Sequence, residues 1–393
     1  MNNRYLVPAP VAVAIAVASL LAAPLAGQTP AVSSGEQKSR ALASPKPATE
    51  GTNSAVPVSP KPTSKPTAKA LAPPQPAESA KRGWTPPRTP WGDPDLQGIW
   101  PGTDFVGVPL QRADSLGTRN ELTDEEFTAR LVAAQKQTED DNAEFDIDNV
   151  PPEVIARGTV GGPVSPPPHW LERGKPSRQG SLIVDPLNGK MPPQAVDAQR
   201  RAAERQNGRN GRGPSDSYED RSLYDRCITR GVLGSILPVI YNNGNQVVQT
   251  PGYVAIRNEM IHETRIVPLD GRPHISKIFH QYMGDSRGHW EGNTLVVETT
   301  NLTDRTGAGG NGGFNLHSAT ARLVEKFTRI GPEMLRYEVT IDDPQTWTKP
   351  WTLSFPWRLD PGYGFYEYAC HEGNYALKNI LSGARAEEGA AAK

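Results

Sequence analysis

The sequence predicts a mainly β protein, with an antiparallel barrel and a few peripheral helices favoured over a β-sandwich. Three observations support this prediction: strand-like segments follow one another from Tyr224 onward, turn residues separate them, and many of them alternate apolar with polar side chains. A period of two gives a strand one buried and one solvated face. A long antiparallel series of such strands closes into a barrel or splits into two packed sheets.

The individual elements follow from local patterns. Strands are expected at 236–241, 246–250, 253–257, 260–267, 294–300, 321–329, 334–341, 352–357 and 365–369, and a shorter strand follows the turn residues at 91–100. Helical insertions are expected around 122–138 and 193–207. In the first, Thr123 and Glu126 have the spacing of a capping box. A short helix at 374–381 is expected to close the series.

The first 83 residues are expected to lie outside the folded domain. Residues 1–27 contain Arg4, an apolar run shorter than a membrane span, and then small residues, which is the order found in a secretory signal peptide. An uncleaved N-terminal anchor is the alternative. Residues 28–83 are mainly Pro, Ala, Ser, Thr and Lys and predict a disordered linker. We therefore expect a periplasmic or secreted protein with one β-rich domain at 84–385 and a disordered tail at 386–393.

Composition limits the partners. The formal net charge of the 393 residues is −1 and no basic block occurs, which argues against a nucleic-acid partner. No segment after the signal is long and apolar enough to span a membrane. We expect a small organic substrate or ligand and no cofactor, since ATP and reduced nicotinamides are not dependably supplied outside the cytoplasm. No common spacing of metal ligands is present, and no metal is expected.

Cys227 and Cys370 are the only cysteines. In an oxidising compartment such a pair predicts one structural disulfide, with two buried thiols or a metal pair as alternatives. If the two residues are bonded, Arg226 and Arg230 come near Glu367, His371 and Glu372. The resulting compact polar cluster is either a site or a buried salt-bridge network.

Histidines point to chemistry in the strand-rich part. Six of the seven lie between His262 and His371, among carboxylates and arginines. Polar groups of this kind inside a barrel can hold a ligand and transfer protons. We therefore predict a lyase-type or isomerase-type enzyme that uses acid/base chemistry for an elimination, a hydration or an isomerisation. A lipocalin-like carrier without turnover and a structural cell-surface module are the alternatives.

Roles can be assigned to particular side chains. The predicted catalytic residues are His280, His317, Asp285 and Arg287. Either histidine would transfer the proton, and the guanidinium would hold an anionic or carbonyl oxygen. The predicted substrate-binding residues are His274, Glu325, Glu367, Trp290 and Trp347. The two tryptophans can stack on an aromatic ligand or a sugar.

Two glycine motifs suggest other chemistry. Residues 284–288 match the Gly-x-Ser-x-Gly pattern of hydrolases, but the helix that this motif requires does not follow, so a tight turn braced by Asp285 and Arg287 is favoured. The glycine-rich residues 307–313 lack the lysine of a phosphate-binding loop. They predict a surface loop, with a loop over a site as the functional alternative.

In an ordered set of motifs, the sequence resembles a large family of secreted bacterial proteins, most of whose members are recorded as hypothetical proteins. Two of these motifs are MGDSRGHWEGNTLVVETTN, beginning at Met283, and YACHEGN, beginning at Tyr368. The resemblance covers residues 90–385 and implies export and a single domain, but no reaction. In the family pattern Arg stands in place of His289, which argues against His289 as an essential acid or base. Gly98 and Trp100 are also similar to the Gly-x-Trp that opens the first strand of lipocalin-like barrels.

Overall fold

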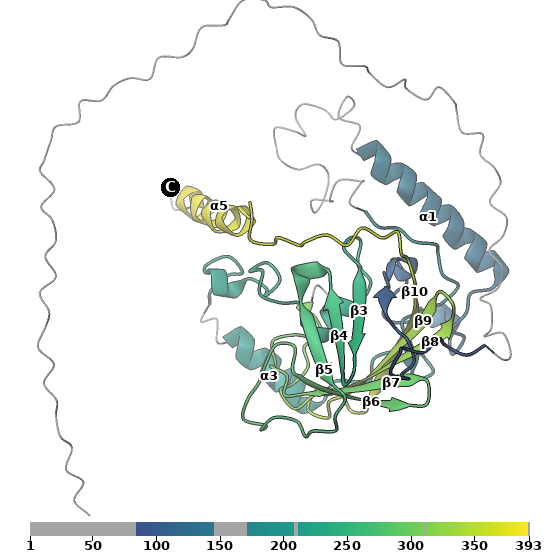
Figure 1. Ribbon diagram of the computed structural model, residues 1–393. Coiled ribbons are helices and arrows are strands. Elements are labelled where there is room, and N and C mark those ends of the chain that lie inside the picture. The colour runs from purple at the N-terminus through teal and green to yellow at the C-terminus, as the bar shows by residue number, and fades with distance from the viewer. Residues whose placement is uncertain (1–83, 145–170, 208–210, 310–311, 392–393) are drawn as a thin grey trace, which may run out of the picture. The chain divides into compact units, whose positions relative to one another are not determined.

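The computed structural model describes residues 84–144, 171–207, 211–309 and 312–391 (Figure 1). The predicted signal peptide and linker lie outside these residues. The described part is mainly β and contains two antiparallel sheets. None of its helices combines the length and the hydropathy needed to cross a membrane.

The smaller sheet has four strands in the order β1-β3-β4-β5. Their bounds are β1 (Gly98–Ile99), β3 (Asn245–Thr250), β4 (Tyr253–Asn258) and β5 (Thr264–Pro268). A tight turn joins β3 to β4, and its Gly252 has a φ of +80°, which glycine adopts without the steric cost that a Cβ imposes. The predicted strands 246–250 and 253–257 are confirmed.

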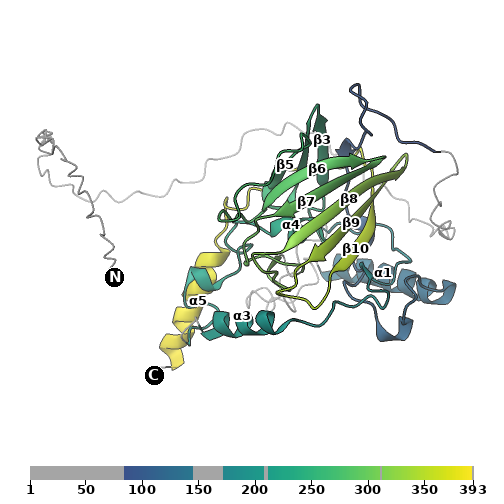
Figure 2. The ribbon, with the colours of Figure 1, turned by 90° about the horizontal axis from the view of Figure 1, so that it is seen from below.

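The larger sheet has six strands in the order β2-β10-β9-β8-β7-β6 (Figure 2). Their bounds are β2 (Ile183–Asp185), β6 (Asp285–Glu291), β7 (Thr294–Thr300), β8 (Arg322–Gly331), β9 (Met334–Asp342) and β10 (Trp351–Arg358). Four predicted strands are thereby confirmed. The Gly-x-Ser-x-Gly motif leads into β6, and the hydroxyl of its Ser286 is buried 2.8 Å from that of Thr299. Most of this motif is therefore part of a strand. It is not an exposed nucleophile turn, and the tight turn that we predicted at 284–288 was wrong.

The inner faces of the strands form the main core. On the larger sheet, Tyr337 stacks on Trp357 with ring centroids 5.0 Å apart and planes 6° apart, and Phe327 and Phe355 flank them. Trp100, just after β1, is fully buried in the same cluster. Burying a large apolar side chain contributes about 2–3 kcal/mol.

Four α-helices are described outside the sheets: α1 (Asp124–Glu144), α3 (Val196–Asn207), α4 (Gly231–Ile236) and α5 (Ala376–Ala391). The capping box of α1 is confirmed: the backbone N–H of Glu126 donates to Thr123 Oγ1 at 3.3 Å, and that of Thr123 donates to the Glu126 carboxylate at 2.8 Å. Phe127 of α1 is buried, whereas Val132 is 65% exposed.

Three local predictions were wrong. Residues 236–241 form no strand, because α4 ends at Ile236 and Pro238, which lacks an N–H, follows. Residues 365–369 form no strand either, and the Tyr366 N–H donates to the Glu259 carboxylate at 3.1 Å in place of a strand partner. The predicted strand 260–267 begins only at Thr264, after a 3-10 turn.

The last helix also differs from its prediction. α5 continues to Ala391, through residues predicted as a disordered tail. Its sequence is rich in alanine and glutamate, which favour the helical state. Arg385 donates to the backbone oxygen of Asp216 at 3.0 Å and so connects α5 with the segment that precedes Cys227.

Candidate functional site: an arginine-lined cleft

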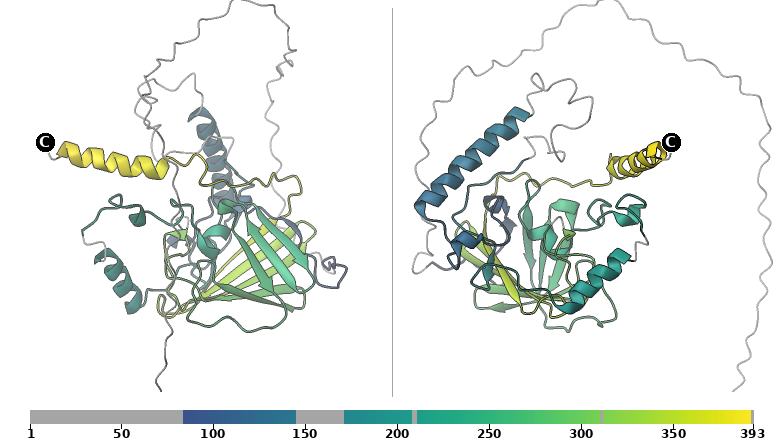
Figure 3. Two further views of the ribbon diagram at one scale, coloured as in Figure 1. Left: turned by 60° about the vertical axis from the view of Figure 1, so that its left-hand side comes forward. Right: turned by 180° about the vertical axis from the view of Figure 1, so that it is seen from behind.

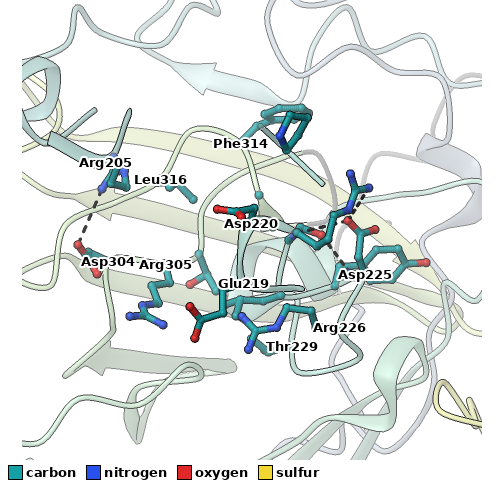
Figure 4. A pocket seen from close by; sticks show the side chains of 18 of the residues that line it. Arg205, Glu219, Asp220, Asp225, Arg226, Thr229, Asp304, Arg305, Phe314 and Leu316 are labelled. Carbon is teal, nitrogen blue, oxygen red and sulfur yellow. Dashed lines mark hydrogen bonds and ion pairs between the residues drawn. The ribbon is translucent and has the colours of Figure 1, made fainter. Parts of the chain in front are cut away.

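A cleft of about 920 Å³ lies between the segment from Arg212 to Thr229 and the loop from Asp304 to Leu316 (Figure 4). Five guanidinium groups line it, and we refer to it as the arginine cleft: Arg205, Arg212, Arg221, Arg226 and Arg305. Gly312 and Gly313 of the glycine-rich loop line it as well. A volume of this size is within the range of small-molecule sites.

Ion pairs hold three of the arginines. They join Arg205 to Asp304 at 3.8 Å, Arg212 to Asp220 at 3.2 Å and Arg221 to Asp225 at 3.1 Å. Among the described residues, Arg226 and Arg305 form no ion pair with a carboxylate. The guanidinium of Arg226 instead lies 5.3 Å from the ring centroid of Tyr218. Glu219 also lines the cleft, so its five arginines face four carboxylates, and the cleft has an excess of one positive charge.

The wall that carries Arg226 is anchored on its far side. The predicted disulfide is confirmed, with Cys227 and Cys370 joined at an S–S distance of 2.00 Å. Next to it, the Tyr224 hydroxyl lies 2.5 Å from that of Tyr241 and 3.1 Å from that of Tyr368. These contacts connect the cleft wall to the chain after β10 and limit how far the wall can move.

The polar cluster expected beside the disulfide is not assembled. Glu367 and His371 are exposed, and among the described residues neither forms an ion pair with Arg226. Because solvent screens exposed charges, proximity in the sequence to a disulfide does not by itself bring them together.

Two threonines at the cleft floor contact titratable groups, the half-buried Glu263 and the buried His317. Thr229 Oγ1 donates to the Glu263 carboxylate at 2.5 Å, and burial raises the pKa of Glu263. Thr306 Oγ1 lies 3.1 Å from His317 Nε2, and burial lowers the pKa of His317. Both threonines are at most 2% exposed.

His317 should make stability depend on pH. Its folded-state pKa lies below the ordinary 6.5, so the unfolded chain binds the additional proton first as the pH falls. The stability that the neutral ring contributes is complete above about pH 6.5 and is lost below it, at up to about 1.4 kcal/mol per pH unit. Denaturant unfolding measured between about pH 7.5 and 5 should show this slope, and the slope should be weaker in His317→Gln.

A matched control uses an exposed histidine. His289, with a side chain 60% exposed, should leave the slope unchanged when it is replaced by Gln. Equal slopes in the wild type and in His317→Gln would contradict the prediction.

Three of the predicted site residues meet on the outer face of β6 and β7. His274 Nδ1 lies 2.7 Å from Asp285 Oδ2, and Arg287 donates to Asp285 Oδ1 at 2.7 Å. On its other side His274 Nε2 lies 3.4 Å from Glu298, whose pKa is lowered mainly by its hydrogen bond with Arg322. We call these five residues the outer-face cluster. The cluster connects the loop before β6 to the sheet.

The remaining predicted residues are scattered. His280 Nδ1 lies 2.9 Å from the Leu302 carbonyl oxygen. Glu325 is buried in an ion pair with Arg265, at 2.6 Å. Trp347 is buried against Trp351 in an edge-on contact, whereas Trp290 is half-buried beside the core and Glu367 is exposed. The assigned roles of these residues stay predictions, and the structure does not bring the residues into one site.

Sequence reasoning did not identify the arginine cleft. Its arginines come from α3, from the segment after it and from the loop after β7, and only the tertiary fold brings them together. One local signal was present: Arg221, Arg226 and Arg230 fall within ten residues around Cys227. Two of these three arginines, Arg221 and Arg226, line the cleft.

Comparison of the chain with protein-family models, with curated proteins and with solved structures finds no significant match.

Proposed function

We propose that this protein is exported and binds a small organic anion in the arginine cleft. The observation that carries the proposal is the pair Arg226 and Arg305, two guanidinium groups in one cleft without a carboxylate partner among the described residues. Guanidinium groups bind carboxylate or phosphate oxygens in bidentate geometry. The disulfide is compatible with an oxidising compartment and with export.

The neighbouring ion pairs support this function. They restrict the conformations of the other three arginine side chains, which lowers the entropy that these side chains lose when a ligand binds. With a net charge of −1, the whole chain does not attract anions. Selectivity for an anion therefore has to come from the cleft itself.

Thermal unfolding of the full mature protein with a panel of organic anions tests the proposal. Mono-, di- and tricarboxylates, phosphate monoesters and sulfate esters form the panel. At least one should raise Tm by several degrees, because a ligand that binds only the folded state stabilises it. The double variant Arg226→Ala/Arg305→Ala should lose this shift. Arg336→Ala, an exposed arginine of β9, should keep it. An unchanged shift in the double variant, or no shift with any anion, would refute the proposal.

The outer-face cluster favours a second function, the acid/base enzyme predicted from the sequence. The observation is the 2.7 Å contact between His274 and Asp285, in which a carboxylate can orient an imidazole for proton transfer. Elimination, hydration and isomerisation remain the proposed reactions. On a confirmed substrate, Asp285→Asn should lower kcat about 10²-fold or more, and full activity would show the assignment to be wrong.

We also propose that the two sheets form one interrupted, lipocalin-like barrel. β5 and β6 lie side by side in Figures 2 and 3, and a Cβ at Gly288 would lie only 2.8 Å from Val267 Cγ1. Near the opposite edges, the Asp360 N–H donates to the Ile99 carbonyl of β1 at 3.1 Å; Asp360 follows β10, the strand next to the edge strand β2. Among the described strands, no hydrogen-bonded ladder joins the two sheets.

A further inference from the structure

The floor of the arginine cleft contains a hydroxyl group beside a buried imidazole. Thr306 belongs to the cleft lining, and His317 lies behind it with Nε2 3.1 Å from Thr306 Oγ1. The next residue after Arg305 is thus the one that contacts the imidazole. Arg305 and Thr306 both line the cleft.

The second ring nitrogen determines the direction of this hydrogen bond. His317 Nδ1 lies 3.0 Å from the Ser318 carbonyl oxygen, which can only accept, so Nδ1 carries the proton. Burial lowers the pKa of His317 and keeps the ring neutral, which leaves a lone pair on Nε2. The Thr306 hydroxyl therefore donates to Nε2. A nucleophilic hydroxyl has the same relation to its general base.

Both partners are fixed in position. Asp343 accepts from the Ser318 N–H at 2.6 Å and from its hydroxyl at 2.7 Å, and so holds the carbonyl that orients His317. Gly231, with a φ of +68°, packs against Thr306 so closely that a Cβ there would lie 2.6 Å from the Thr306 Cβ. Hydroxyl, base and orienting group then follow the order of a catalytic triad, with a carbonyl as the third member.

Building on the anion-binding function proposed above, we propose that the cleft hydrolyses esters of small organic anions, with Thr306 as nucleophile and His317 as general base. Thr306 Oγ1 attacks the ester carbonyl carbon, and its proton moves to His317 Nε2. The bond from that carbon to the leaving oxygen breaks, and the leaving oxygen takes the proton. Water then adds to the acyl group by the same proton path, releases the acid and restores the hydroxyl. Arg226 and Arg305 hold the anionic group of the substrate.

The probe is meta-acetoxybenzoate, an acetate ester with a carboxylate in its leaving group, and phenyl acetate is its neutral counterpart. The full mature protein should hydrolyse the anionic ester with a kcat/KM at least about 10²-fold above that of Thr306→Val. Rapid acid quenching followed by trypsin should locate one acetyl group on Thr306, in the peptide 306–322. Thr306→Ser should keep turnover, since it keeps the hydroxyl.

Further variants separate the roles. His317→Gln should lose turnover and leave Thr306 unacetylated. If this variant does not fold, the position of the acetyl group in the wild type and the turnover of Thr306→Val test the assignment instead. Thr340→Val removes a threonine hydroxyl on the outer face of β9 and should change nothing. Arg226→Ala/Arg305→Ala should raise KM for the anionic ester only.

Two outcomes distinguish this inference from the function on which it rests. If anions bind the cleft but the ester is not hydrolysed, or if Thr306→Val is fully active, the catalytic inference is overturned and anion binding stands. If no anion binds and the arginine variants behave as the wild type, both are overturned.

Discussion

Glu325→Leu should lower the free energy of unfolding by about 3–5 kcal/mol, because it leaves the guanidinium of Arg265 buried without its counter-charge. The Arg265 and Glu325 side chains are 2% and 0% exposed, and two hydrogen bonds of 2.6 and 2.8 Å join them between β5 and β8. Tyr337 donates a third hydrogen bond to the same carboxylate at 3.1 Å. Denaturant unfolding of both proteins at neutral pH measures the difference.

Two controls make this prediction specific. The double variant Arg265→Met/Glu325→Leu should recover most of the loss, because an apolar pair of similar volume avoids the desolvation penalty of the ions. Lys136→Ala breaks the exposed ion pair with Asp140 on α1 and should have no measurable effect. A Glu325→Leu protein as stable as the wild type would show that the pair contributes nothing, and would reopen the predicted substrate-binding role of Glu325.

The sequence allowed much of the larger sheet to be predicted, for a local reason. β9 alternates apolar with polar residues from Leu335 to Asp342, so a period of two identifies both the strand and its inner face. β7 is recognised instead by its run of residues that favour strands. The same alternation places Glu325 between Leu323 and Phe327 and therefore inward. Its partner Arg265 could not be predicted, because that pairing depends on β5 of one sheet facing β8 of the other.

The site was less predictable than the fold for the same reason. Acid/base residues were selected by type, and the structure places them in separate environments: His317 behind the cleft floor, Asp285 on an outer sheet face and Glu325 in the core. Arg226 and Arg305 lie nearly eighty positions apart in the chain and share a cleft only through the folded loops. A histidine in a strand-rich region indicates possible chemistry, but its function depends on contacts between distant segments.

The double variant Cys227→Ser/Cys370→Ser should lose about 2–5 kcal/mol of unfolding free energy, and anions should bind it more weakly. The bond connects residues 143 positions apart, and in the chain-entropy model a loop of that length constrains the unfolded chain by about 5 kcal/mol. Cys227 also has a φ of 55°, in the left-handed region that non-glycine residues rarely adopt, and it directly follows Arg226. Without the bond, this wall of the cleft can relax.

Stability and affinity must be measured separately to locate the effect. Denaturant unfolding gives the free energy of unfolding. Titration with the anion that binds most tightly gives the affinity, at a temperature where both proteins are fully folded. Tyr368→Phe, which removes one neighbouring hydrogen bond and keeps the disulfide, serves as the comparison. If stability falls and affinity does not, the tyrosine contacts alone hold Arg226 in place. If neither changes, the disulfide between the cleft wall and the chain after β10 contributes nothing to stability or to anion affinity. The rigidity proposed for the cleft then has to arise from its ion pairs.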